Sequence, residues 1–282
     1  MTNKKRYIWS VSVALGGFLF GFDTVVISGA NLPIKELWNL GPWLHGVFIM
    51  SMALWGTVFG ALFGAIPCDK YGRKKTLLWI GILFFISAIG SAIAIDPYSF
   101  SFFRFIGGVG VGASTVAAPT YISEISSKNN RGQLVALYQF NIVLGILIAY
   151  FSNYFLKGVG GEIDWRFMLG VEALPAFVYT IIILYVPNSP RWLVIFKKDK
   201  NKAIEVLSEI YEKSRVNEKI KEIENSFVKN SKETLFSNVY NFHILLAFLI
   251  AFFNQFSGIN FVLYYAPEIL EQAGFASKDS LM

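Results

Sequence analysis

Seven apolar runs of about 20 residues or more divide this chain, and the charged residues are mostly confined to the segments between them. A helix of about 20 apolar residues is long enough to cross the hydrocarbon core of a bilayer. The runs are Ile8–Ala30, Trp43–Pro67, Thr76–Ile95, Ser99–Ile122, Leu134–Leu156, Phe167–Val186 and His243–Leu270. With 54% hydrophobic and only 16% charged residues, the composition is also more apolar than that of a soluble domain. We therefore predict an all-α membrane protein that lies in the lipid bilayer.

The first run resembles the start of a signal peptide because Lys4, Lys5 and Arg6 precede it. It is longer than the apolar region of a signal peptide, however, and no clear cleavage site follows it. We predict an uncleaved first span.

Basic residues gather on alternate sides of the predicted spans. They lie before the first span and in the second, fourth and sixth connections, as Lys4–Arg6, Lys70, Arg73–Lys75, Lys128, Arg131 and the lysines between Pro187 and Asn241. The opposite connections hold only Lys35, Lys157 and Arg166. Cytoplasmic loops are the ones enriched in Lys and Arg, so we predict a multi-pass protein of the cell (plasma) membrane with a cytoplasmic N-terminus. The formal net charge of +6 is then a property of these loops and gives no reason to expect a nucleic-acid partner.

The sixth connection has a different composition from the spans. Apolar residues recur there at helical spacing, at Ala203, Val206, Leu207, Ile210 and Tyr211, while lysines and glutamates fill the other positions. We predict amphipathic cytoplasmic helices packed on the bundle or on the membrane surface, and a docking site for a soluble partner is the alternative. The predicted divisions are residues 1–190 for a six-helix half, 191–241 for a cytoplasmic helical linker, and 242–282 for span seven.

Glycines in three spans favour close helix packing. They recur four residues apart at Gly17 and Gly21 and at Gly56, Gly60 and Gly64. The glycines between Gly107 and Gly112 look like a dinucleotide-binding loop, but they follow no strand and lie within an apolar helix. Helix contacts are the better interpretation.

Two charges stand out inside the predicted spans, Asp23 and Arg104. A charge at membrane depth is a functional hypothesis by default, and these two are each other's natural partners. A purely structural salt bridge is the alternative.

The seventh run contains a cluster of polar residues at Asn254, Gln255, Ser257 and Asn260, around Gly258. Amides at membrane depth are costly unless they face protein or a water-filled cavity, and glycine weakens a helix. We predict a discontinuous span of the kind that forms transporter binding sites. Amides that only tie neighbouring helices together are the alternative.

Four motifs resemble those of one family. Asp69–Lys74 (DKYGRK) is similar to the D-R-x-G-R-R/K loop of the major facilitator superfamily. Pro119–Glu124 (PTYISE) with Arg131, Pro187–Arg191 (PNSPR) and Asn254–Asn260 (NQFSGIN) resemble, in this order, three motifs of its sugar porter family. Asn188 replaces the acid of P-E-S-P-R, and Asn254 replaces the first glutamine of Q-Q-x-S-G-I-N.

The resemblance implies a major-facilitator-type bundle and a set of site residues. Sugar contacts are implied for Phe20, Gln139, Ile142, Ile146, Asn254, Gln255, Asn260 and Tyr265. Proton coupling is implied for Asp23 and Arg104, and a cytoplasmic gating network for Asp69, Arg73, Glu124, Arg131 and Arg191. Amides suit an uncharged sugar because each both donates and accepts hydrogen bonds. For Phe20 and the two isoleucines, ordinary packing is the alternative, and basic residues kept inside by the membrane field are the alternative for the network.

The function implied is monosaccharide transport by alternating access, coupled to proton symport. Partners would be a small-molecule sugar, protons and the lipid bilayer. The alternatives are a non-transporting sugar sensor and a fragment of a truncated gene. Members of the family have twelve spans, so we expect a missing C-terminal half and no transport by the given chain alone. No cofactor is implied, no enzyme-like set of residues is found, and the spacing of His45 and His243 predicts no metal site.

Overall fold

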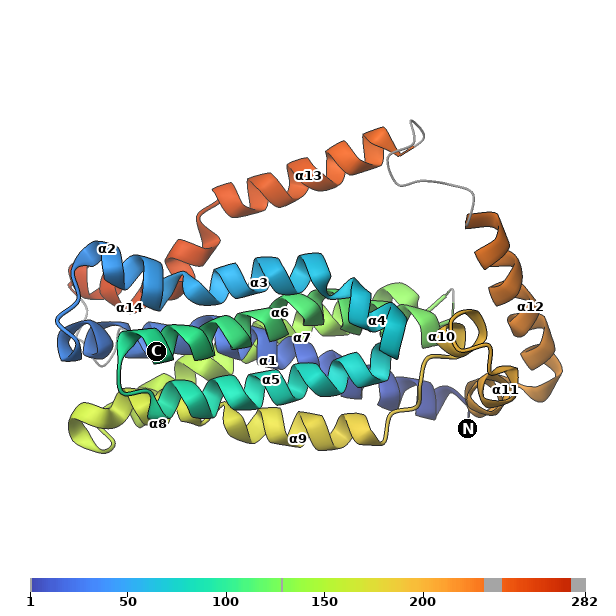
Figure 1. Cartoon of the computed structure of the whole chain (residues 1–282), viewed down its shortest axis with the longest axis horizontal. Helices are drawn as coiled ribbons and strands as arrows, with labels where there is room; N and C mark the ends of the chain where they lie inside the picture. The colour runs from blue at the N-terminus through green and yellow to red at the C-terminus, as the bar shows by residue number, and fades with distance from the viewer. Residues whose placement is uncertain (1, 128, 231–239, 275–282) are drawn as a thin grey trace.

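The computed structural model describes residues 2–127, 129–230 and 240–274, and all regular elements in these ranges are helical (Figure 1). The elements of the first half are α1 (Thr2–Leu37), α2 (Pro42–Leu44), a π-helical turn η1 (His45–Met50), α3 (Met52–Phe63), α4 (Ala65–Tyr71), α5 (Arg73–Ile93) and α6 (Pro97–Ile125). They continue as α7 (Arg131–Leu156), η2 (Gly161–Ile163), α8 (Asp164–Gly170), α9 (Ala173–Leu184), α10 (Pro190–Ile195), α11 (Lys200–Ile210), α12 (Lys213–Asn230), α13 (Asn241–Phe256) and α14 (Ile259–Gln272).

The helices provide seven stretches that are long and apolar enough to cross a membrane. The stretches are Lys4–Leu37, Pro42–Phe63, Arg73–Ile93, Pro97–Ile125, Arg131–Leu156, Gly161–Leu184 and Asn241–Gln272. Each coincides with one of the seven predicted runs. The prediction of an all-α protein with seven spans is therefore confirmed.

Helix α1 lies at the centre of the bundle, where it contacts α5, α6, α7, α8, α9 and α14. Its closest neighbour is α7, and glycine makes this approach possible. A methyl group added at Gly17 or Gly21 would collide with the backbone carbonyls of Tyr138 and Ile142. The predicted role of these two glycines in helix packing is confirmed.

Helices α3 and α6 pack in the same way. Added methyl groups at Gly56 and Gly60 would strike the carbonyl oxygens of Phe105 and Val109 on α6. In the other direction, Gly108 faces the carbonyl of Ala53. The two backbones are therefore in direct contact, and the glycine run of α6 is a packing surface.

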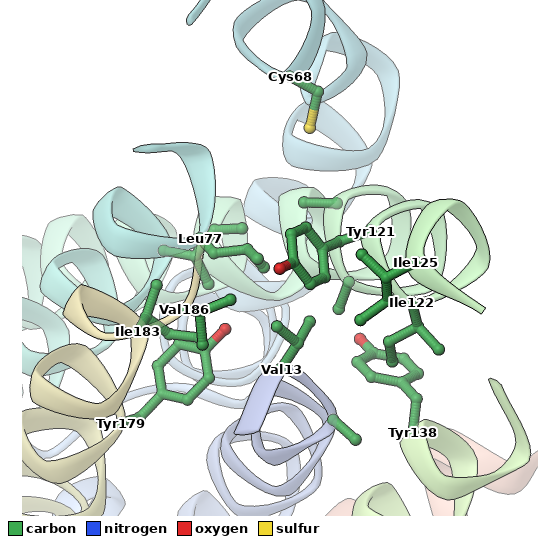
Figure 2. Packing of buried hydrophobic residues seen from close by; sticks show 14 of the residues in the cluster. Val13, Cys68, Leu77, Tyr121, Ile122, Ile125, Tyr138, Tyr179, Ile183 and Val186 are labelled. Carbon is green, nitrogen blue, oxygen red and sulfur yellow. The ribbon is translucent and has the colours of Figure 1, made fainter. Parts of the chain in front are cut away.

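One apolar core runs from the bundle to the helices beyond it (Figure 2). In the figure, Val13 of α1 lies between Tyr179 and Ile183 on one side and Tyr138 on the other, with Tyr121 and Leu77 above. The same cluster extends to α11 and α12 through Leu207, Ile210, Val216 and Ile220.

Helices α10, α11 and α12 gather at the end of the bundle that holds the N-terminus (Figure 1). Arg6 Nη2 donates a hydrogen bond to the Ile210 carbonyl at 2.6 Å, and Lys5 pairs with Glu209 at 2.8 Å. The prediction of amphipathic helices packed on the bundle is confirmed. The predicted divisions at 190 and 241 remain predictions, and residues 231–239 and 275–282 within the last two divisions lie outside the described residues, as does Lys128.

The seventh span is broken at the predicted glycine. Gly258 has φ +75°, in the left-handed region, and separates α13 from α14. Helix α14 packs against α1, whereas α13 diverges from the bundle (Figure 1).

Candidate functional site

A buried ion pair joins α1 to α6 at the centre of the bundle. Arg104 Nη1 lies 2.6 Å from Asp23 Oδ1, and Arg104 Nη2 donates to the Asp23 backbone carbonyl at 2.9 Å. The side chains are 2% and 1% exposed. The two residues predicted as partners are thus brought together, by a close contact between helices whose small residues allow it.

A second carboxyl, that of Glu172, completes this cluster. Glu172 lies between α8 and α9, is 1% exposed, and is close enough to Asp23 for a side-chain hydrogen bond. Its Oε1 atom has no hydrogen-bond partner among the described residues. The prediction named only Asp23 and Arg104 as charges within the spans and so missed Glu172, although this acid lies inside the run Phe167–Val186 and meets the same criterion.

The seventh span reaches the same cluster through Tyr264 of α14. This tyrosine is 5% exposed and lies close enough to Asp23 and Arg104 for their charges to act on its hydroxyl group. Tyr264 is not among the predicted site residues, whereas its neighbour Tyr265 is predicted to contact the sugar. The buried cluster therefore combines side chains from the first, fourth, sixth and seventh spans.

The predicted sugar-contacting residues of the six-helix part lie on α1 and α7. Phe20 and Ile146 are half-buried, and Ile142 is 8% exposed within the core. Ile142 and Ile146 meet α1 at Gly21. Gln139, one turn earlier on α7, is exposed.

The predicted polar residues of the seventh span lie on both sides of the break. Asn260 Nδ2 donates to Gln255 Oε1 at 2.9 Å across Gly258. Asn254 and Gln255 are exposed and line a hollow of about 450 Å³ on α13. Asn260 and Tyr265 line another, of about 200 Å³, between α14 and the second span. The structure joins Gln255 to Asn260, and among the described residues no hydrogen bond links Gln139 to them.

Another acid within a predicted span, Glu268, was also missed. It accepts a short hydrogen bond from Asn31 Nδ2, and the Asn31 side-chain oxygen contacts Nε2 of the buried His45. Tyr150 of α7 also donates to the Leu263 carbonyl at 3.0 Å. These contacts attach α14 to α1, to the π-helical turn and to α7.

The predicted cytoplasmic network is partly assembled. Arg73 pairs with Asp69 at 3.0 Å and with Glu124 at 2.9 Å. Arg131 and Arg191 line a cavity beside Glu124, and no ion pair of theirs is observed within the described residues. In the same region, burial raises the pKa of the Cys68 thiol, so this side chain stays neutral beside the charged pairs.

This arrangement, a six-helix bundle with a buried ion pair and a broken seventh span, can be compared with known proteins. The sequence profile described as "Sugar (and other) transporter" matches residues 9–282. The chain belongs to this family. The earlier resemblance to the sugar porters of the major facilitator superfamily is confirmed, and the chain is a multi-pass membrane protein.

Two curated relatives show how much of a family member the chain represents. The arabinose-proton symporter of Bacillus subtilis is 37% identical over 274 residues, and the D-xylose transporter of Levilactobacillus brevis is 37% identical over 273. The matches cover 94% and 95% of this chain but 59% of each relative. The chain therefore spans about three fifths of the sugar transporters that it matches.

A solved structure of the same family has the same fold. The proton:xylose symporter XylE, bound to 6-bromo-6-deoxy-D-glucose, superposes with a TM-score of 0.89 at 30% identity. The superposition covers 100% of this chain and 66% of that chain. The major-facilitator-type bundle predicted for the first six spans and the seventh is thereby confirmed.

Proposed function

We propose that the protein carries a monosaccharide across the membrane by alternating access, coupled to proton symport. The observation that carries the proposal is the buried cluster of Asp23, Glu172 and Arg104. Two carboxyls share one guanidinium there, so the fully ionised cluster has one net negative charge, and binding of one proton neutralises it. The names of the relatives, an arabinose-proton symporter and a D-xylose transporter, support both the substrate class and the coupling.

In the proposed mechanism, protonation of the cluster controls the ion pair that joins two of the spans. With Asp23 ionised, the ion pair at 2.6 Å holds α1 to α6. A proton on Asp23 removes the charge that Arg104 faces and leaves Glu172 as the alternative partner of the guanidinium. Tyr264 interacts with the same pair, so this exchange also affects the broken seventh span.

Sugar binding is proposed for the residues that the family resemblance implied. Gln139, Gln255 and Asn260 supply amides for sugar hydroxyls, with Asn254 beside them. Phe20, Ile142, Ile146 and Tyr265 would cover the apolar faces of the sugar ring. Pairing of Arg73 with Glu124 supports a gate at the N-terminal end of the bundle, which we place in the cytoplasm, with the protein in the plasma membrane.

The experiment joins this chain to the remaining length of the B. subtilis relative and reconstitutes it in liposomes. We expect an inward proton gradient to drive uphill accumulation of radiolabelled xylose or arabinose. Asp23→Asn should abolish accumulation but retain sugar exchange, which needs no net proton movement. Glu162→Gln, at an exposed acid of η2 just before α8, is the matched control and should accumulate sugar normally. Accumulation that persists in Asp23→Asn would show that Asp23 is a structural charge.

A further inference from the structure

A cavity of about 190 Å³ lies where the N-terminal end of the bundle meets α11 and α12. It differs from the hollows of the seventh span because charged side chains from separate helices converge on it. Arg131 comes from the first turn of α7, Arg191 from α10, and Lys219 from α12. Ser123 and Tyr211 are also on its wall.

Positive charge exceeds negative charge around this cavity. Its two acids already have partners, because Glu222 pairs with Lys219 at 2.6 Å and Glu124 pairs with Arg73 at 2.9 Å. The positive charge of Arg191 also acts on the Glu124 carboxylate. Arg131 and Arg191 have no ion pair within the part of the chain that the structure describes, and the cavity is lined by three cations and two acids.

One further cation, Arg6, lies beside Tyr211 of the cavity wall. The Arg6 guanidinium carbon is 4.7 Å from the centre of the Tyr211 ring, and Lys219 Nζ is 5.7 Å from it. In addition, the turn before α10 has Asn188 where the sugar porter motif carries an acid, so this turn supplies no carboxylate to Arg191. The surroundings thus favour an anion.

A phosphate group suits two neighbouring guanidinium groups that have no ion pair among the described residues. Arginine offers a planar fork of N–H donors that binds phosphate oxygens in pairs, and it stays charged at all relevant pH values. A phosphate group would supply the negative charge that this lining lacks. Lys219 of α12, which also pairs with Glu222, adds a further cation to the lining.

We propose that this cavity binds a phosphate group, free or carried by a small phosphorylated molecule, between Arg131, Arg191 and Lys219. Because Arg131 and Arg191 belong to the bundle and Lys219 to α12, the bound phosphate links α12 to the bundle. Phosphate binding therefore stabilises the packing of the linker helices, α12 in particular, against the bundle. This site is separate from the buried Asp23 cluster and its test requires no transport.

The experiment measures the binding of radiolabelled inorganic phosphate to the purified 282-residue chain in a zwitterionic detergent. Thermal stability is followed in parallel at constant ionic strength with phosphate, glucose 6-phosphate or chloride. We expect both phosphates, but not chloride, to raise the unfolding temperature and to protect α12 from trypsin. Arg191→Gln should weaken phosphate binding about ten- to hundredfold, the usual effect of losing a charge-assisted hydrogen bond.

Arg131→Gln is the second test variant, because Arg131 is exposed and its loss should not disturb folding. The matched control is Lys197→Gln, an exposed cation outside the cavity, which should bind phosphate like the parent. Equal binding by Arg131→Gln, Arg191→Gln and the parent would overturn the proposal. An equal effect of chloride would also overturn it, because the site would then respond to ionic strength alone.

The source of the phosphate is distinguished in nanodiscs. If phosphatidic acid lowers the affinity for inorganic phosphate relative to phosphatidylcholine, lipid headgroups reach the site. If the affinity is unchanged, the site binds free phosphates of the aqueous phase. Both results support the site and identify its ligand.

Discussion

At the scale of single residues, the buried cluster of Asp23, Glu172 and Arg104 has an unequal charge balance. One guanidinium serves two carboxyls, and all three side chains are at most 2% exposed. Removing the cation leaves buried acids without a counter-charge, whereas removing one acid leaves a matched pair. The three residues should therefore differ in their effects on stability.

We predict that Arg104→Gln lowers the free energy of unfolding by about 3–5 kcal/mol, the usual effect of breaking a buried ion pair. Glu172→Gln should cost less than about 1.5 kcal/mol, because the amide keeps the shape and the Asp23–Arg104 pair stays intact. Thermal unfolding in detergent, followed by near-ultraviolet circular dichroism, measures both. If the two variants lose equal stability, Glu172 is as necessary as Arg104 and our account of the charge balance is wrong.

At the scale of helices, backbone contact between α3 and α6 sets strict limits on substitution. A methyl group at Gly60 would meet the Val109 carbonyl, which belongs to the backbone and cannot rotate away. We predict that Gly60→Ala lowers the free energy of unfolding by about 1–3 kcal/mol or more, which is the usual effect of overpacking.

Gly132→Ala is the control for this prediction, because the space around Gly132 is open and alanine favours helix. It should leave the unfolding temperature unchanged or raise it slightly. Size-exclusion chromatography after a heating series measures the folded fraction of both proteins. A Gly60→Ala protein as stable as the parent would mean that α3 and α6 are farther apart than described here.

The break in the seventh span depends on the backbone conformation of one residue. Gly258 has φ +75°, which costs other residues about 1–2 kcal/mol, least for asparagine. We predict that Gly258→Ala loses about this much stability and that Gly258→Asn recovers most of it. The same heating series tests this pair, and equal losses for alanine and asparagine would indicate a steric cause instead.

The average hydropathy along the chain determines how many of these helices and breaks the sequence can predict. Long apolar runs identify the spans, and Gly258 among polar residues identified the break, because both effects are local in the chain. Glu172 was missed since one acid hardly changes the average hydropathy of the run Phe167–Val186. Tyr264 was missed because its position beside the cluster depends on the rotation of α14 about its axis, which follows from packing against α1. Sequence also gave no signal for the π-helical turn at His45–Met50.

At the scale of the whole molecule, the orientation in the membrane is the main prediction. Basic residues gather at the end of the bundle that holds the N-terminus, α11 and α12. Segments enriched in Lys and Arg are usually on the cytoplasmic side of the membrane. A reporter inserted after Gly161 should therefore be extracellular, and one inserted near Lys213 cytoplasmic. Paired phosphatase and fluorescent-protein fusions in intact cells measure this. The reverse pattern at both sites would invert the orientation.

The ion pair between α1 and α6 also has a consequence for biosynthesis. Asp23 and Arg104 are 81 positions apart, so the first span leaves the ribosome well before its partner is made. A charge at the middle of a lone helix costs about 2.5–3.5 kcal/mol when the translocon inserts it. Until the fourth span is made, only the apolar residues of the first span offset this cost. The ion pair can therefore form only after the fourth span has been synthesised, so the first span is inserted before its buried charge has a partner.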